Sequence, residues 1–192
     1  MKIILTSFHH LAYLFSDQKA IISEDIEAWY KNYLIDKTPS LSYLLIKYPA
    51  FRSQFSYRIK MENKTFLKIL LVFADILLKK QSNLYITTPS IKGGLFFLHG
   101  FSTIVSAKSI GENCWINQQV TIGYTTHDGA PVLKDNVRVY AGAIVIGNII
   151  IGDNVIIGAN AVVVKDVPDN CTVVGNPAHV VKQNGIKVYK KL

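Results

Sequence analysis

The chain has few of the residues that form covalent or metal cross-links. Its 192 residues include only two cysteines, Cys114 and Cys171, which lie far apart and lack the spacing of metal ligands. The cysteines therefore indicate neither a disulfide framework nor a zinc site. We expect a reducing, cytoplasmic compartment and no bound metal.

The sequence also lacks an apolar run long enough to cross a bilayer. Ser7, His9 and His10 interrupt the apolar start of the chain and no cleavage site follows, so we expect no signal peptide. The longest candidate, residues 66–78, contains Lys68 and Asp75. It is too short and too charged for a membrane span, which predicts a core helix.

Acidic residues are outnumbered by basic ones. The chain has 21 Lys and Arg against 13 Asp and Glu, a formal net charge of +8. This excess suits nucleic acid, an anionic membrane surface or a phosphate-rich small ligand, and it selects none of them. An ordinary basic surface accounts for it as well.

Apolar residues recur at intervals of three and four in the first 85 residues. Some of them lie on one face of a helix that begins near Ser23, and others fall within residues 66–78. Pro39 and Pro49 interrupt this part of the chain, because proline lacks the N–H that a helix interior needs. The sequence therefore predicts an N-terminal domain of about four helices over residues 1–85.

A six-residue period replaces this pattern after residue 103. Two series of Ile, Leu and Val are spaced by six and are expected to point inward: Ile104, Ile110, Ile116 and Ile122, then Leu133, Val139, Val145, Ile151, Ile157 and Val163. Such a period is typical of a parallel β-helix, in which each hexad supplies one short strand and a corner. The step from Ile122 to Leu133 is eleven residues, which predicts a loop around residues 125–131 containing His127.

Two stretches of the repeat region resemble hexapeptide-repeat acyltransferases. They are HGFSTIVSAKSIGENCWINQQVTIG (99–123) and VYAGAIVIGNIIIGDNVIIGANAVVVKDVPDNCTVVGNPAHVVK (139–182). The resemblance is strongest to the serine acetyltransferase branch and its relatives in surface-polysaccharide biosynthesis. It covers about residues 86–182, with a weaker match at YPAFRSQFSYRI (48–59).

The resemblance implies a mainly β fold, a left-handed parallel β-helix preceded by the helical domain. Residues 86–178 would form the β-helix and residues 179–192 a C-terminal tail. It further implies a homotrimer, with acetyl-CoA as donor substrate in the groove between neighbouring subunits.

Two histidines are candidate catalytic residues. His99 occupies the position of the family's catalytic histidine, and a neutral imidazole can accept the proton of a hydroxyl. A structural histidine is the alternative. His127, followed by Asp128, is expected to position the acceptor or the thioester carbonyl, unless it is an exposed loop residue.

Five residues are candidates for binding acetyl-CoA. Ala141, Gly142 and Ala159 match the family's positions along the pantetheine arm. Lys165 and Lys182 lie where relatives meet the nucleotide phosphates, for which a cation is suited. Solvated surface lysines are the alternative for these two.

Three contacts that the family makes to serine are missing or doubtful. Tyr85 or Ile86 stands where an Asp orients the catalytic histidine, Leu98 replaces the Asp directly before that histidine, and Thr126 precedes His127 in place of an Arg. Without these groups the charges of a zwitterion would be unpaired. We therefore expect a neutral hydroxyl acceptor, best matched by a saccharide of a surface polysaccharide.

Other functions stay open. Serine O-acetylation in cysteine biosynthesis is the first alternative. A zinc hydratase of the same architecture requires three histidines, and His99, His127 and His179 are the candidates here. A third reading is a non-catalytic trimeric scaffold. The basic amphipathic helices also allow peripheral contact with the inner face of a membrane, and no nucleic-acid partner is expected.

Overall fold

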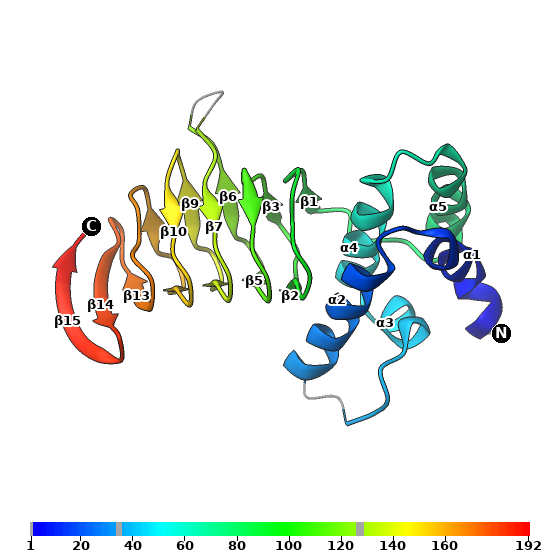
Figure 1. The fold of residues 1–192 in the computed structure, drawn as a ribbon, viewed down its shortest axis with the longest axis horizontal. Coiled ribbons are helices and arrows are strands. Elements are labelled where there is room, and N and C mark those ends of the chain that lie inside the picture. The colour runs from blue at the N-terminus through cyan, green and yellow to red at the C-terminus, as the bar shows by residue number, and fades with distance from the viewer. Residues whose placement is uncertain (1, 34–35, 126–128) are drawn as a thin grey trace.

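The chain folds into a helical domain followed by a stack of β-strand coils (Figure 1). The structure is a computed structural model, and it describes residues 2–33, 36–125 and 129–192. The N-terminus lies in the helical domain, and the C-terminus lies at the far end of the stack. In the described part of the chain, no helix is long and apolar enough to span a membrane.

Five helices precede the first strand in the described residues. They are α1 (Lys2–Phe15), α2 (Lys19–Asn32), α3 (Leu41–Lys47), α4 (Pro49–Lys60) and α5 (Thr65–Leu77). Pro49 is the first residue of α4, a position where its fixed φ and missing N–H cost nothing. Residues 50–59 of α4 are all buried, so this helix is the centre of the domain.

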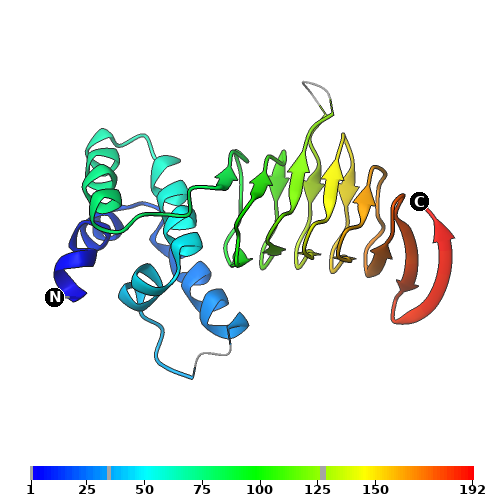
Figure 2. The ribbon, with the colours of Figure 1, turned by 180° about the vertical axis from the view of Figure 1, so that it is seen from behind.

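The predicted core helix at residues 66–78 is only partly correct. Helix α5 forms there, but it buries only Leu67, Leu71 and Ala74. Its opposite face is apolar and exposed, with Ile76 69% accessible and Val72 59% accessible. Helices α1 and α5 lie side by side at the end farthest from the strands (Figure 2). The apolar spacing therefore predicted the helix and its buried face, but α5 also exposes an apolar face and is not a core helix.

Short strands form three sheets along the stack. The strands are β1 (Leu84–Ile86), β2 (Phe96–Leu98), β3 (Thr103–Val105), β4 (Ser109–Ile110), β5 (Trp115–Asn117), β6 (Thr121–Gly123), β7 (Val132–Leu133), β8 (Arg138–Val139), β9 (Ile144–Ile146), β10 (Ile150–Ile151), β11 (Ile156–Ile157), β12 (Val162–Val163), β13 (Cys171–Val174), β14 (His179–Gln183) and β15 (Ile186–Lys191). Their orders are β1-β3-β6-β9-β12, β4-β7-β10 and β2-β5-β8-β11-β13-β14-β15. All pairs are parallel except the last two. Successive strands along the chain thus fall in different sheets, as in a β-helix.

The predicted inward positions are correct with one exception. From Ile110 to Val163, all nine predicted residues of the two series are at most 1% accessible. Ile104, however, is 43% accessible and faces outward, whereas Val105 is buried and pairs with Ile122. The inward step from Val105 to Ile110 is therefore five residues, so a strict period of six misplaces the first coil by one residue.

The predicted C-terminal tail is a structured hairpin. Strands β14 and β15 pair antiparallel with each other, and β14 pairs with β13. The hairpin extends the seven-stranded sheet beyond the last coil, so it satisfies the strand edge that β13 would otherwise expose.

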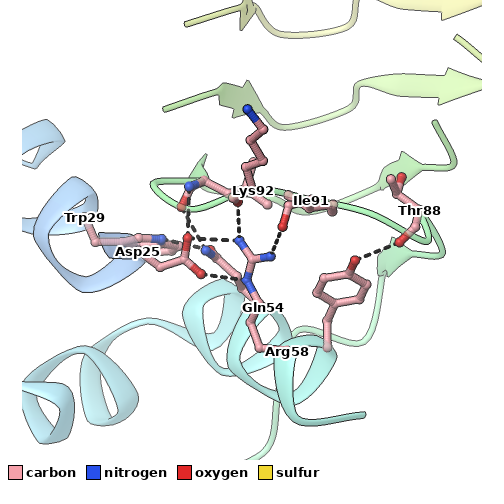
Figure 3. A network of polar contacts seen from close by, with 9 residues as sticks. Asp25, Trp29, Gln54, Arg58, Thr88, Ile91 and Lys92 are labelled. Atoms are coloured by element: carbon pink, nitrogen blue, oxygen red, sulfur yellow. Dashed lines mark hydrogen bonds and ion pairs between the residues drawn. The ribbon is translucent and has the colours of Figure 1, made fainter. Parts of the chain in front are cut away.

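A buried polar network fastens the helical domain to the first coil (Figure 3). Arg58 of α4 binds Asp25 of α2 through two hydrogen bonds of 2.9 and 3.1 Å. Arg58 also donates to the carbonyls of Ile91 and Lys92, and Asp25 accepts from the Leu95 N–H at 3.0 Å. Because both charged side chains are nearly inaccessible, this network fixes how α2 and α4 lie against the coil.

Candidate functional site

His99 lies at a tight corner between β2 and β3. Its φ is +66°, and Gly100 follows with φ +67°. The Gly100 N–H donates to the Leu98 carbonyl at 2.9 Å, which closes a turn around His99. A Cβ on Gly100 would lie 3.1 Å from the Ala50 side chain, so the helical domain packs directly against this corner. The His99 side chain is exposed, and a left-handed histidine is uncommon enough to suggest a functional constraint.

A pocket of about 480 Å³ opens beside His99. His99 is its one lining residue from the β-helix; the others come from α2, α3 and α4 and their ends: Trp29, Tyr33, Lys47, Tyr48, Pro49 and Ala50. Tyr33 and Tyr48 are stacked, with ring centroids 4.5 Å apart. Lys47 is the one charged side chain among these described lining residues, and no carboxylate lines the pocket.

Tyr33 lines the same pocket as His99. Burial raises the pKa of the Tyr33 hydroxyl above its usual value. The hydroxyl therefore stays protonated at neutral pH. The network around Asp25 and Arg58 holds α2 and α4, the two helices that place Tyr33 and Tyr48 at the pocket.

The apolar spacing of the helical half did not indicate that these aromatic residues form a pocket wall. Tyr48 begins the YPAFRSQFSYRI match and Lys47 directly precedes it, so the weaker resemblance in the helical half was the available signal. The sequence contains no signal of a pocket at Tyr33 or Trp29, since both fit equally well as core residues of an amphipathic helix. Leu98, which occupies an acidic position of the family, is partly buried beside His99.

The corner of His99 recurs in each following coil and forms a ridge along the β-helix. The Gln119 N–H donates to the Phe101 carbonyl, the Gly142 N–H to Gln118, and the Asn160 N–H to Ala141. The predicted cofactor residues Ala141, Gly142 and Ala159 therefore lie on the same ridge as His99. Ala141 and Gly142 are partly exposed and Ala159 is exposed, so an extended chain can approach the backbone here.

The two predicted phosphate-binding lysines are not brought together. Lys165 lines a pocket of about 600 Å³ that Gly175, His179, Tyr189 and Lys191 also line, beyond the Ala159 corner. Its ammonium donates to the Leu192 carbonyl at 2.6 Å. Lys182, by contrast, lies on β14 and is not among the residues that line this pocket.

Other candidate chemistry receives no structural support. Burial raises the pKa of Cys114 to about 12, so its thiol is not a nucleophile at neutral pH. The described residues contain no group of three His, Cys, Asp or Glu that could hold a metal ion. His99 lies in the first coil and His179 beyond the last one, so they cannot share a zinc ion. His127 lies outside the described residues.

Comparisons with known proteins identify relatives of this chain. Residues 130–165 match the family model described as bacterial transferase hexapeptide (six repeats). A serine acetyltransferase from Bacillus pumilus is 32% identical over 184 residues, which are 90% of this chain and 81% of that protein. The chain belongs to the serine acetyltransferase family. It spans only 41% and 51% of two other serine acetyltransferases, from Synechococcus elongatus and Staphylococcus aureus.

Solved structures of this family share the fold. The serine acetyltransferase of Neisseria gonorrhoeae in complex with serine has a TM-score of 0.68 and 28% identity, covering 90% of this chain and 73% of that one. The Brucella abortus enzyme in complex with coenzyme A has a TM-score of 0.62 and 26% identity, covering 89% and 70%. These likenesses confirm the predicted fold class, a left-handed parallel β-helix with an N-terminal helical domain.

Proposed function

We propose that the chain is an acetyl-CoA-dependent O-acetyltransferase in which His99 is the general base. The observation that carries this proposal is the ridge of recurring corners that leads from Ala159, past Ala141 and Gly142, to the exposed side chain of His99. Family membership and the relative solved with coenzyme A support it.

The reaction proceeds by direct transfer. The imidazole of His99 takes the proton from the acceptor hydroxyl as its oxygen attacks the thioester carbonyl of acetyl-CoA. The tetrahedral intermediate then expels the CoA thiolate, which recovers the proton from the imidazolium. Acetyl-CoA is a substrate here, and the residues proposed along it are Ala141, Gly142 and Ala159, with Lys165 near its phosphates. Because Lys182 does not line the pocket that contains Lys165, we expect it to contribute less to phosphate binding.

We further propose a homotrimer in which acetyl-CoA lies between neighbouring subunits. A groove between β-helices would bury the pantetheine arm, which a single convex ridge cannot do. We keep His127 as a second proposed catalytic residue, which would position the thioester or the acceptor. Membership in a hexapeptide-repeat family supports this arrangement.

Serine is the acceptor that the comparisons favour. The relative that aligns with 90% of this chain is named a serine acetyltransferase, and a similar structure holds serine. Acetylation of serine would make the chain an enzyme of cysteine biosynthesis. This weighs against our expectation from the sequence that a saccharide is the acceptor.

A saccharide is the second candidate, and one observation favours it. The α-amine of serine needs an anionic partner, but the described lining of the His99 pocket contains no carboxylate and Leu98 stands beside it. The half-buried rings of Tyr33 and Tyr48 instead suit the apolar face of a sugar ring.

Release of thiol from acetyl-CoA separates the two acceptors. The purified full chain is assayed with serine and, in parallel, with mono- and oligosaccharides. We expect acceptor-dependent release at a rate typical of enzymes, on the order of 10 per second. Turnover with serine at that rate would exclude the saccharide as acceptor. Turnover with a sugar but not with serine would exclude serine. If none of the tested acceptors stimulated thiol release, the proposed transferase activity would be contradicted.

A further inference from the structure

Lys47 lies on the wall of the His99 pocket and is held there by two tyrosines. Its ammonium donates a hydrogen bond to the Tyr43 hydroxyl, with Nζ 2.9 Å from the oxygen. The same nitrogen lies 5.3 Å from the ring centroids of both Tyr43 and Tyr48. Surface lysines normally sample many rotamers, so these contacts fix a positive charge at one place.

The charge of Lys47 is not neutralised by a neighbouring acid. The salt bridges of the described residues do not include Lys47, and no carboxylate lines its pocket. Lys37 also contacts the Tyr43 ring, at 5.5 Å from the centroid, but it does not line the pocket. Helix α4 begins at Pro49 on the same wall, which adds partial positive charge. The pocket therefore combines an excess of positive charge with an exposed base.

Hydrogen bonding keeps this charge in place at working pH. The Tyr43 and Tyr48 hydroxyls raise the pKa of Lys47 above its usual value. The ammonium has three donors and gives one to Tyr43, so further donors remain for a bound molecule. A carboxylate or a phosphate group is the natural partner of such a donor.

We propose that Lys47 binds an anionic group on the acceptor, a carboxylate or a phosphate, while the acceptor hydroxyl faces His99. This inference rests on the proposed function and deepens it. The same chemistry is offered by the carboxylate of serine and by an acidic saccharide, such as a uronate or a sugar phosphate. A neutral sugar, our expectation from the sequence, leaves the Lys47 charge unpaired. Lys47 thus determines specificity and does not take part in proton transfer.

The test measures acceptor binding directly, by ligand-observed NMR titration of the full chain. The probes are L-serine, methyl glucuronide and methyl glucoside. We expect the wild-type chain to bind at least one acidic probe about tenfold more tightly than the glucoside, which corresponds to about 1.4 kcal/mol. Lys47→Gln should abolish this preference, and Lys47→Arg, which retains the charge, should keep most of it.

Lys37→Gln is the matched control, because Lys37 contacts the same Tyr43 ring but does not line the pocket. It should leave the preference unchanged. Equal binding of glucoside and acidic probes by the wild-type chain, or a preference that persists in Lys47→Gln, would overturn the inference. If Lys47→Gln lost the preference but the wild-type chain transferred acetyl to none of the acceptors, the anion site would be supported and the proposed function refuted.

Discussion

The helical domain and the β-helix are stabilised in different ways. The β-helix has an interior of stacked Ile, Leu, Val and Ala side chains, contributed by equivalent positions in successive coils. The helical domain is irregular. Its contact with the first coil combines the packing of Trp29 and Tyr33 on Phe96 with a buried ion pair and several side-chain hydrogen bonds. The stacked interior is the same from coil to coil. The contact between the helical domain and the first coil instead specifies one placement of two helices on that coil.

The same division runs through the proposed site. The β-helix supplies His99 and the ridge for the donor, both built from recurring corners. The helical domain supplies the wall that includes Tyr33, Lys47 and Tyr48. We infer that the β-helix determines which donor is used and the helical domain determines which acceptor.

The largest effect is expected at the junction. Arg58→Ala leaves the carboxylate of Asp25 buried without its partner, so the free energy of unfolding should fall by about 3–5 kcal/mol. Urea unfolding followed by circular dichroism measures this loss. The double variant Asp25→Leu/Arg58→Met should lose clearly less than the sum of the two single variants. Additive losses would mean that Asp25 and Arg58 do not stabilise each other.

The stability of the β-helix should depend on the volume of its buried apolar side chains and not on buried charges. Ile151→Ala removes a fully buried side chain from the stacked core, which should cost about 2–4 kcal/mol of unfolding free energy. Ile150→Ala, at the adjacent 49% accessible position, is the matched control and should cost no more than about 0.5 kcal/mol. Similar losses at both positions would contradict the inward and outward assignment of this strand.

How far the sequence predicts each region follows from the same difference. Ile110 and Ile116 were correctly assigned to the interior because a recurring coil imposes a recurring spacing. Ile104 was misplaced because the first coil is one residue shorter. The pairing of Asp25 with Arg58 joins residues 33 positions apart, and no local period records such a contact. His99 and the ridge residues could be predicted from the family resemblance. Lys47 became a candidate for binding the acceptor only when the structure placed the end of α3 beside the His99 corner.

A pH-dependent effect on stability is expected from His9 in the helical domain. Burial lowers the pKa of His9 to about 4, and neither ring nitrogen has a hydrogen-bond partner among the described residues. Below pH 6.5 the unfolded chain binds a proton that the folded chain does not, so stability is present above pH 6.5 and declines as the pH falls toward 4. Between pH 7.5 and 5.5 the loss should be about 1.3 kcal/mol.

Urea unfolding at the two pH values measures the His9 contribution. His9→Leu should reduce the difference by about that amount. His10→Leu, on the exposed side of the same helix, should leave the difference unchanged. An unchanged difference in His9→Leu would assign the pH dependence to other groups.

The smallest effect concerns the two lysines of the C-terminal region. Lys165 lines the pocket beyond the ridge, so Lys165→Gln should weaken coenzyme A binding about fivefold, or about 1 kcal/mol. Lys182→Gln should change the affinity less than about twofold, because Lys182 does not line that pocket. Isothermal titration calorimetry with coenzyme A measures both affinities. A larger loss in Lys182→Gln than in Lys165→Gln would mean that the phosphates bind near Lys182 and not in the Lys165 pocket.

We propose that His99 acts as the base and that the ridge binds acetyl-CoA independently of the His99 side chain. The decisive measurement compares wild-type and His99→Ala chains in the acetyl-CoA thiol-release assay, with coenzyme A affinity measured on the same samples. We predict that turnover falls at least about a hundredfold while the affinity stays within about twofold. Turnover retained in His99→Ala would show that another group is the base and would contradict the account.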